Sequence, residues 1–264
     1  MKTLLLINPN TSAPVTRLMA EVMRPLLGAD VALEPVTARF GASYIASEPA
    51  YAVAAHAALD AWAAHRAAGG RCDAVLVGCF GDPGVGALRE LAGVPVTGLA
   101  EAALREAAAH GPHAVVTGGA AWKPMLERFA AAQGLDAGLC GVHVVERSGA
   151  ELMAQPDGGE AELLGALRAA ADGPARALVI GGAALGGIAQ RVAPRLALPV
   201  IDSVQAGARW ARAVLAASGA GGASPSASAA SAQAASPSGS SAARDAAVRW
   251  TGLSPELATA LSSR

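Results

Sequence analysis

Short, mostly apolar runs alternate with longer amphipathic stretches over most of the chain. These runs cover residues 2–7, 74–78, 94–97, 114–117, 177–180 and 198–201. Each run ends in a polar or glycine-rich turn, and a helical pattern follows the turn. Apolar runs of this length that are separated by helices are typical of parallel strands buried on both faces. The pattern therefore predicts an α/β fold with parallel sheets.

Three helix starts are marked by capping residues. After the turn at residues 8–12, Thr11 or Ser12 is the expected N-cap, with Pro14 in the first turn. Ser47 is expected to cap a second helix that extends to about Gly69. A third helix is expected to start at Asp82-Pro83, with Asp82 as its N-cap. The same order of strand, turn and helix is thus repeated along the chain.

The chain contains an internal repeat. The paired segments are residues 75–79 with 178–182, 94–98 with 198–202, and 5–8 with 114–117. Two pseudo-equivalent open sheets would each place the carboxyl ends of their strands at a crevice, where ligands bind in such folds. We therefore expect a cleft between two halves, lined by Asn8, Cys79, Thr117 and Gly182.

The domain organisation follows from this repeat and from one shift in composition. We expect a first lobe from residues 1–98 together with 206–217 and 244–264, and a second lobe from residues 99–205. Between residues 218 and 243 the sequence is dominated by Ala, Ser, Gly and Pro, which predicts a flexible linker. Residues 244–264 regain helical character and are expected to dock back on the body.

Charge and cysteine content exclude several classes of function. The formal net charge is −1, so there is no basic footprint for nucleic acid. No apolar run approaches the roughly 20 residues of a membrane span, and the first run is too short for a signal peptide. The three cysteines have no metal-ligand spacing, and their odd number suits reduced thiols. A cytoplasmic protein without a bound metal is expected.

Cys79 is the strongest candidate for chemistry. It follows a buried strand and precedes the helix expected at Asp82-Pro83, so the helix dipole and nearby amides are expected to favour its thiolate. The amides of Phe80 and Gly81 are candidates for an oxyanion hole. The alternative is a structural cysteine, because free cysteines are often buried. Cys72 and Cys140 are expected at the amino-terminal edges of the sheets, where they would be inert.

Two further segments are candidates for ligand binding. The turn at residues 8–12 offers amides and short polar side chains at a helix start, which suits a small anion or serves capping alone. Residues 117–119 occupy the pseudo-equivalent place, which favours binding. Gly181 and Gly182 allow close approach of a backbone, either to a ligand or to a packed neighbour.

Several motifs resemble the hydantoin racemase branch of the aspartate/glutamate racemase superfamily. They are Ile7-Asn8-Pro9-Asn10-Thr11-Ser12, Gly78-Cys79-Phe80-Gly81-Asp82-Pro83-Gly84, the stretch from Arg39-Phe40-Gly41 to Trp62, and Gly252-Leu253-Ser254-Pro255. The likeness covers the whole chain except the linker. It implies two pseudo-symmetric flavodoxin-like lobes, with the active site in the cleft between them, and a homo-oligomer.

The resemblance also implies cofactor-independent racemisation between two cysteines, one on each face of the substrate. The first matches Cys79, but the second falls at Gly182, which cannot move a proton. Ala183 and Ala184 stand where Thr and His often follow the second cysteine in amino-acid racemases of this family. By position, the expected substrate-binding residues are Asn8, Asn10, Ser43, Phe80, Gly81, Thr117, Gly182 and Ala183.

Three functions follow from this departure. The first is an isomerase in which Cys79 transfers a proton at a carbon next to a carbonyl, with water or a substrate group serving the other face. The second is a one-cysteine lyase that resembles arylmalonate decarboxylase. The third is a protein that binds a small acid without turnover. Because no lysine or arginine occurs among the candidate positions, a small substrate held by neutral hydrogen bonds, such as a hydantoin ring or a single carboxylate, is expected.

Overall fold

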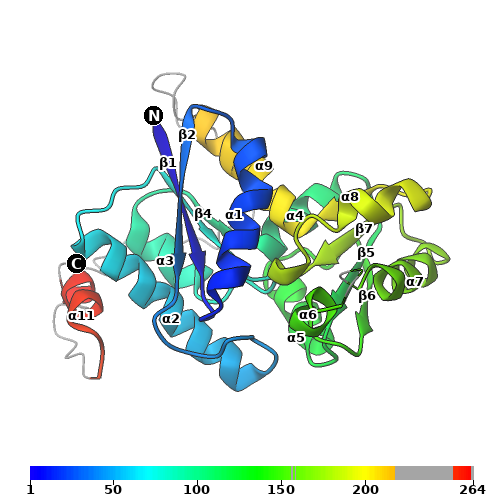
Figure 1. Ribbon diagram of the computed structural model, residues 1–264, viewed down its shortest axis with the longest axis horizontal. Coiled ribbons are helices and arrows are strands. Elements are labelled where there is room, and N and C mark those ends of the chain that lie inside the picture. Colours follow the sequence, from blue (N-terminus) through cyan, green and yellow to red (C-terminus); the bar gives the residue numbers. More distant parts are fainter. Residues whose placement is uncertain (156, 158, 218–251, 263–264) are drawn as a thin grey trace.

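The computed structural model describes residues 1–155, 157, 159–217 and 252–262 of the chain. The linker predicted at residues 218–243 lies outside the described residues. Two four-stranded sheets lie side by side along the long axis of the molecule (Figure 1). The strands in each sheet are parallel to one another. The predicted α/β class with parallel sheets is thus confirmed.

The first lobe is built on a sheet of order β2-β1-β3-β4. Its elements are β1 (Lys2–Asn8), α1 (Ala13–Leu27), β2 (Val31–Thr37), α2 (Glu48–Ala67), β3 (Ala74–Val77), α3 (Val85–Ala92) and β4 (Val96–Gly98). The β1 side chains from Leu4 to Ile7 are completely buried, as are those of β3. Because helices cover both faces of the sheet, side chains on both sides of these strands are buried, and their sequences are therefore unbroken apolar runs.

The second lobe repeats the arrangement with a sheet of order β6-β5-β7-β8. Its elements are β5 (His113–Gly118), α5 (Trp122–Ala132), β6 (Leu139–Val145), α6 (Gly149–Met153), α7 (Glu160–Ala171), β7 (Ala177–Gly181), the 3₁₀ turn η1 (Ala183–Leu185), α8 (Ala189–Val192), η2 (Ala193–Arg195) and β8 (Val200–Asp202). Helix α7 packs against β5, β6 and β7, and its buried leucines fill a second core.

Two helices connect the lobes. Helix α4 (Leu99–Ala108) leads from β4 to the second lobe, and α9 (Ser203–Ala217) returns from β8 to pack against α1. The two helices also pack against each other. They are related by the internal repeat, because each directly follows the last strand of its sheet.

The register of the sheets defines which residues of the two lobes are equivalent. Val75 pairs with Val96 in the first sheet, and Leu178 pairs with Val200 in the second. Counting four residues forward along β3 and β7 brings Cys79 and Gly182 to equivalent positions. The alignment inferred from the sequence repeat is confirmed by this pairing.

Helix starts agree with the capping pattern in two cases out of three. Ser12 and Ser47 occupy the N-cap positions of α1 and α2, and the Ser47 hydroxyl accepts a hydrogen bond from the Ala50 amide (3.4 Å). The third start is wrong: α3 begins at Val85, with Gly84 at its N-cap in the left-handed conformation. Asp82 does not cap α3, because its side chain turns toward α4.

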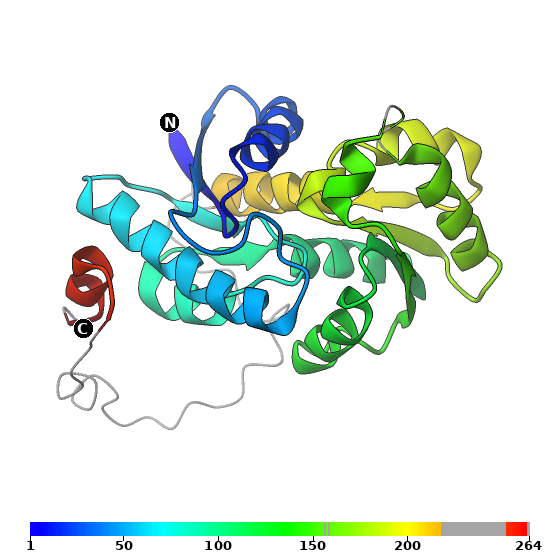
Figure 2. The ribbon, with the colours of Figure 1, turned by 60° about the horizontal axis from the view of Figure 1, so that its bottom comes forward.

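A C-terminal helix, α11 (Pro255–Ser262), lies beside α2 (Figure 2). Leu257 is its buried anchor, with 1% of its surface exposed. Arg39 joins the two segments, since its guanidinium contacts Asp60 of α2 (2.9 Å) and Glu256 of α11 (3.3 Å). The helix therefore packs on the first lobe through apolar residues, with Ala260 and Leu261 beside Leu257, and through the ion pair of Glu256 with Arg39.

Replacing Leu257 by alanine is expected to release α11 from α2. Leu-to-Ala substitution at a buried site costs about 2–5 kcal/mol, which is a large share of what a helix of two turns gains by docking. Amide hydrogen exchange should therefore accelerate across residues 255–262 while β1 stays protected. The exposed Thr259→Ala is the control; unchanged protection of α11 in Leu257→Ala would contradict the anchoring role.

Candidate active site

A small cavity of about 40 Å³ lies between the carboxyl ends of the two sheets. The first lobe lines it with Asn10, Val15, Tyr44, Ile45, Gly78, Cys79 and Phe80. The second lobe contributes Thr117, Gly118, Trp122, Gly149, Gly181, Gly182, Ala183, Ala184 and Leu185. None of these lining residues carries a charged side chain at neutral pH, as the sequence led us to expect. A ligand here would be held by neutral hydrogen bonds and apolar contacts.

Cys79 reaches this cavity directly after β3 and is 6% exposed. Burial raises the pKa of its thiol, and the charge of Asp82 raises it further. The helix expected to start at Asp82 begins only at Val85, and burial governs the direction of this pKa shift. A raised pKa favours the protonated thiol over the thiolate.

The predicted binding residues divide into two groups. Asn10, Phe80, Thr117, Gly182 and Ala183 line the cavity together with Cys79. Asn8, Ser43 and Gly81 do not. The cavity thus lies between the lobes but is not lined by every residue that the repeat suggested.

The turn after β1 is held together by Asn8. Its side-chain amide donates to Asn10 Oδ1 (2.9 Å), to the Ser12 carbonyl (3.1 Å) and to Thr16 Oγ1 (2.9 Å). Asn8 is completely buried, and its side-chain amide is used within the turn, so Asn8 is not accessible to a ligand. Asn10 accepts from the Ser12 amide (2.8 Å), and its own Nδ2 makes no hydrogen bond within the described residues. Asn10 is therefore the ligand-facing residue of this turn.

Ser43 is exposed, and the next two residues of its loop turn inward instead. The Tyr44 hydroxyl accepts a hydrogen bond from the Gly149 amide (3.0 Å) and donates to the Gly118 carbonyl (3.4 Å). The Trp122 indole donates to the Ile45 carbonyl (3.1 Å). Sequence reasoning missed Tyr44 and Trp122, although an aromatic residue beside a candidate loop position is a usable signal. These contacts fasten a loop of the first lobe to the second lobe.

Glycines near the cavity make room for side chains of the opposite lobe. A Cβ at Gly181 would overlap the Phe80 ring, and a Cβ at Gly81 (φ +145°) would lie 2.6 Å from the Trp122 ring. Gly182 differs, because a Cβ there would meet only Leu185 at 3.4 Å. Its φ of +141° is the reason for glycine at this position.

Backbone donors face the cavity from both lobes. The amides of Phe80 and Ala183 make no hydrogen bond within the described part of the chain. The Gly182 amide donates to Ser203 Oγ (3.3 Å), and Thr117 Oγ1 donates to the Gly181 carbonyl (2.7 Å). Phe80 and Ala183 are therefore the amides available to a carbonyl or enolate oxygen.

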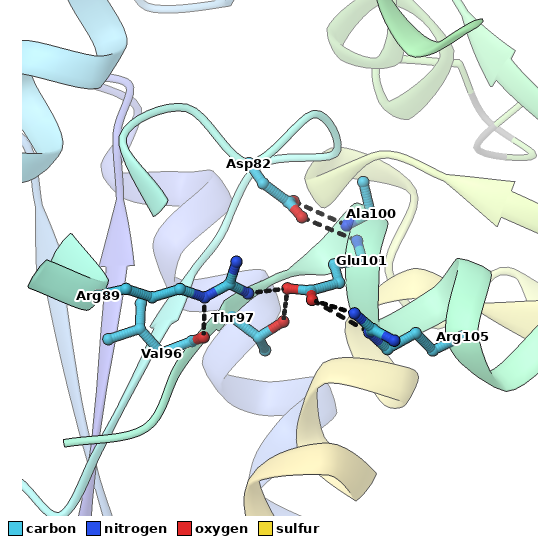
Figure 3. Close-up of polar contacts among 7 residues, drawn as sticks. All are labelled: Asp82, Arg89, Val96, Thr97, Ala100, Glu101 and Arg105. Atoms are coloured by element: carbon cyan, nitrogen blue, oxygen red, sulfur yellow. Dashed lines mark hydrogen bonds and ion pairs between the residues drawn. The ribbon is translucent and has the colours of Figure 1, made fainter. Parts of the chain in front are cut away.

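Asp82 connects the Cys79 turn to α4 (Figure 3). Its carboxylate accepts from the amides of Ala100 and Glu101, both at 2.8 Å. A Cβ at Gly98 would overlap that carboxylate, so glycine is required there. Asp82 has φ +56°, the only positive value at a non-glycine residue in the described ranges. The turn is thus held in a strained conformation by the start of the neighbouring helix.

A second buried carboxylate, Glu101, lies next to this cap (Figure 3). Burial alone raises the pKa of Glu101, but the Thr97 hydroxyl (2.7 Å), Arg89 and Arg105 hold it below its usual value. Arg89 also donates to the Val96 carbonyl (3.0 Å). The network fixes α4 against β4 and α3, and with it the helix end that Asp82 caps.

Replacing Asp82 by asparagine is expected to remove a pH dependence of stability. Burial raises the pKa of Asp82 to about 7, against 3.8 in its ordinary state. The folded state therefore holds the proton more tightly, so this stabilisation is complete at low pH and is lost as the pH rises toward 7. The free energy of unfolding of the wild type, relative to Asp82→Asn, should fall by roughly 1 kcal/mol per unit between pH 5 and 7.

Urea unfolding of both proteins at pH 5, 6, 7 and 8 measures this difference. The curve should level off above pH 7. A difference that stays constant over the whole range would show that Asp82 titrates at its ordinary value.

The described residues form neither a metal site nor a membrane span. No group of three or more His, Cys, Asp or Glu side chains suited to a metal ion occurs among the residues that the structure describes. Likewise, the described helices include none with the length and hydropathy needed to cross a bilayer.

The chain is similar to known racemases. Two allantoin racemases with solved structures, from Klebsiella pneumoniae and Pseudomonas fluorescens, both give a TM-score of 0.77. The first is 27% identical and covers 83% of this chain and 89% of its own; the second is 26% identical and covers 82% and 92%. A liganded variant of arylmalonate decarboxylase, 21% identical with a TM-score of 0.61, shares the fold.

Sequence comparison agrees. The hydantoin racemase of Paenarthrobacter aurescens is 27% identical over 230 residues, which are 81% of this chain and 91% of that protein. The hydantoin racemase of Pseudomonas sp. (strain NS671) is 26% identical over 212 residues, or 79% and 84%. These matches support a racemase. The family profile described as Asp/Glu/hydantoin racemase matches residues 4–211, and the chain therefore belongs to that family.

Proposed function

We propose that the protein is a cofactor-independent racemase of a hydantoin-like substrate and that Cys79 moves the proton. The observation that carries this proposal is the single thiol in a cavity between the lobes whose other polar groups are neutral. A hydantoin ring is uncharged in its neutral form and presents carbonyl oxygens and N–H groups, which such a cavity can pair. Hydantoin racemases and allantoin racemases are among the relatives, and both named substrates contain this ring.

The proposed reaction begins at the carbon between the ring nitrogen and a carbonyl. Cys79, as thiolate, takes the proton on that carbon, and the electron pair moves to the carbonyl oxygen. In this proposal the amides of Phe80 and Ala183 bind the resulting enolate oxygen, while Asn10 Nδ2 and Thr117 orient the ring; all four residues line the cavity. Return of a proton to the opposite face completes inversion.

A one-cysteine decarboxylase is the second candidate, and the glycine at position 182 favours it, because decarboxylation needs a proton on one face only. A malonate carries two negative charges, however, and the cavity lining offers no cation to either of them. Burying an unpaired carboxylate is costly. The racemase is therefore the better match to the electrostatics of this cavity.

A homo-oligomeric assembly and a cytoplasmic location remain predictions from the sequence. Sedimentation and fractionation of the native protein measure them directly, and the proposed reaction depends on neither.

Cys79→Ser is expected to abolish racemisation, with a loss of at least ~100-fold, because a serine hydroxyl is a far weaker acid than a thiol and forms far less of the anion that removes the proton. Enantiopure 5-substituted hydantoins, allantoin and an arylmalonate would be incubated with wild type and variant in deuterium oxide. NMR follows exchange at the ring carbon, and polarimetry follows inversion.

The exposed Cys140→Ser is the matched control and should keep wild-type activity. Release of carbon dioxide from the malonate without racemisation of any hydantoin would favour the lyase. Absence of exchange and decarboxylation with all substrates would leave a binding protein.

The pH dependence of kcat/KM offers a separate prediction. Because burial raises the pKa of Cys79, the thiolate fraction should keep growing above the ordinary pKa of a cysteine. The rate constant for proton removal should therefore increase about tenfold per pH unit past pH 9. Initial rates of wild-type racemisation between pH 6 and 10 measure it, and a plateau below pH 8 would show a thiolate stabilised by the bound substrate.

A further inference from the structure

Two side chains of the cavity carry an acidic proton, one on a thiol and one on a phenol. Among the described residues that line it, only Cys79 and Tyr44 carry a thiol or a phenol, and no histidine, lysine or carboxylate joins them. Tyrosine is an established general acid and base in enzymes. Tyr44 is therefore the candidate for the proton-transfer residue that the proposed reaction needs on the second face of the substrate.

The Tyr44 hydroxyl is held by the second lobe, although its backbone belongs to a loop of the first. It contacts the carbonyl of Gly118 at the end of β5 and the amide of Gly149 at the start of α6. A Cβ built on Gly149 would lie 3.7 Å from this hydroxyl and 3.4 Å from the Ala184 Cβ. The hydroxyl is therefore close to the loop after β7, whereas Cys79 enters from β3.

That loop contains Gly182, the position equivalent to Cys79 in the second lobe. A glycine there leaves the second-lobe side of the cavity without a proton of its own. The Tyr44 side chain crosses the cleft from the first lobe and brings a hydroxyl to the second-lobe side of the cavity.

The two hydrogen bonds of Tyr44 suit proton transfer. The bond that it donates to Gly118 is 3.4 Å long, near the weak limit for a hydroxyl, so little is lost when the proton turns toward a ligand. The bond that it accepts from the Gly149 amide is shorter, at 3.0 Å, and remains in place after deprotonation. A phenolate left behind would keep that donor.

We propose that the Tyr44 hydroxyl is the second proton-transfer group of the racemase, on the substrate face opposite Cys79. This inference rests on the function proposed above. From one enantiomer, Cys79 thiolate forms an S–H bond as the C–H bond breaks, and the electron pair passes to the carbonyl. The enolate then forms a new C–H bond with the Tyr44 proton, which leaves a phenolate. Exchange of protons with solvent then returns Cys79 to the thiolate and Tyr44 to the phenol. The opposite enantiomer runs the same steps in reverse, starting from Cys79 thiol and Tyr44 phenolate.

Tyr44→Phe tests the assignment, because it removes the hydroxyl and keeps the ring. Each enantiomer of a 5-substituted hydantoin is incubated separately in deuterium oxide with Tyr44→Phe, and inversion and exchange are measured. Inversion should fall at least ~100-fold for both enantiomers. Exchange with retention should survive for the enantiomer whose proton faces Cys79 and be lost for the other, while Cys79→Ser should show the opposite preference.

Trp122→Phe separates chemistry from loop fastening, because it removes the indole's bond to Ile45 and its interaction with the Tyr44 hydroxyl but leaves that hydroxyl in place. This variant should affect exchange of both enantiomers to a similar degree. If Tyr44→Phe behaves in that way, or racemises at the wild-type rate, the assignment of Tyr44 is overturned. If the wild type exchanges neither enantiomer, the racemase itself is refuted, and the two failures are therefore distinguishable.

Discussion

The carboxylate of Asp82 fixes the cleft, since it joins the turn that carries Cys79 to the helix that leads into the second lobe. Two backbone amides of α4 hold it, and Gly98 gives it the room. A residue with positive φ costs about 1–3 kcal/mol unless its surroundings compensate. Here the compensation comes from the two hydrogen bonds, so the thiol's position depends on α4 rather than on the helix that follows it in sequence.

The second lobe makes the equivalent connection from the other end. Asp202, at the start of α9, accepts from the amides of Val204 (2.9 Å) and Gln205 (3.1 Å), and it also accepts from Gly187 in the loop after β7 (2.7 Å). In the first lobe the carboxylate belongs to the loop after β3, and in the second it belongs to the last residue of β8, directly before α9. The repeat therefore preserves the link between strand loop and helix start, although not the residue that provides it.

The sequence predicted the architecture because its signals are local. Buried parallel strands need unbroken apolar runs, and helix starts need Ser12 or Ser47 at the cap, so both were visible in a window of a few residues. The equivalence of the Cys79 and Gly182 positions in the two lobes can be predicted because the repeat preserves the spacing between strands. The helix expected at Asp82 was misplaced, because a carboxylate can cap a helix distant in sequence as well as its own.

The missed residues act across the cleft. Tyr44 contacts residues 74 and 105 positions away, and the Trp122 indole reaches a carbonyl 77 positions away. No periodicity or motif reports contacts at such separations. Ser43 illustrates the same limit at close range: a loop residue and its neighbour point in different directions, and only the packing of the second lobe determines which of them enters the cavity.

The absence of a steric clash at Gly182 has an evolutionary consequence. A side chain there would meet one leucine at ordinary contact distance, so the barrier to a second thiol is the backbone conformation, a cost of about 1–3 kcal/mol, and not a crowded core. A lineage can cross a barrier of that size with one stabilising substitution elsewhere. One-thiol and two-thiol cavities are thus near neighbours in sequence space, and a fold of this kind can exchange one proton-transfer arrangement for the other without rebuilding its lobes.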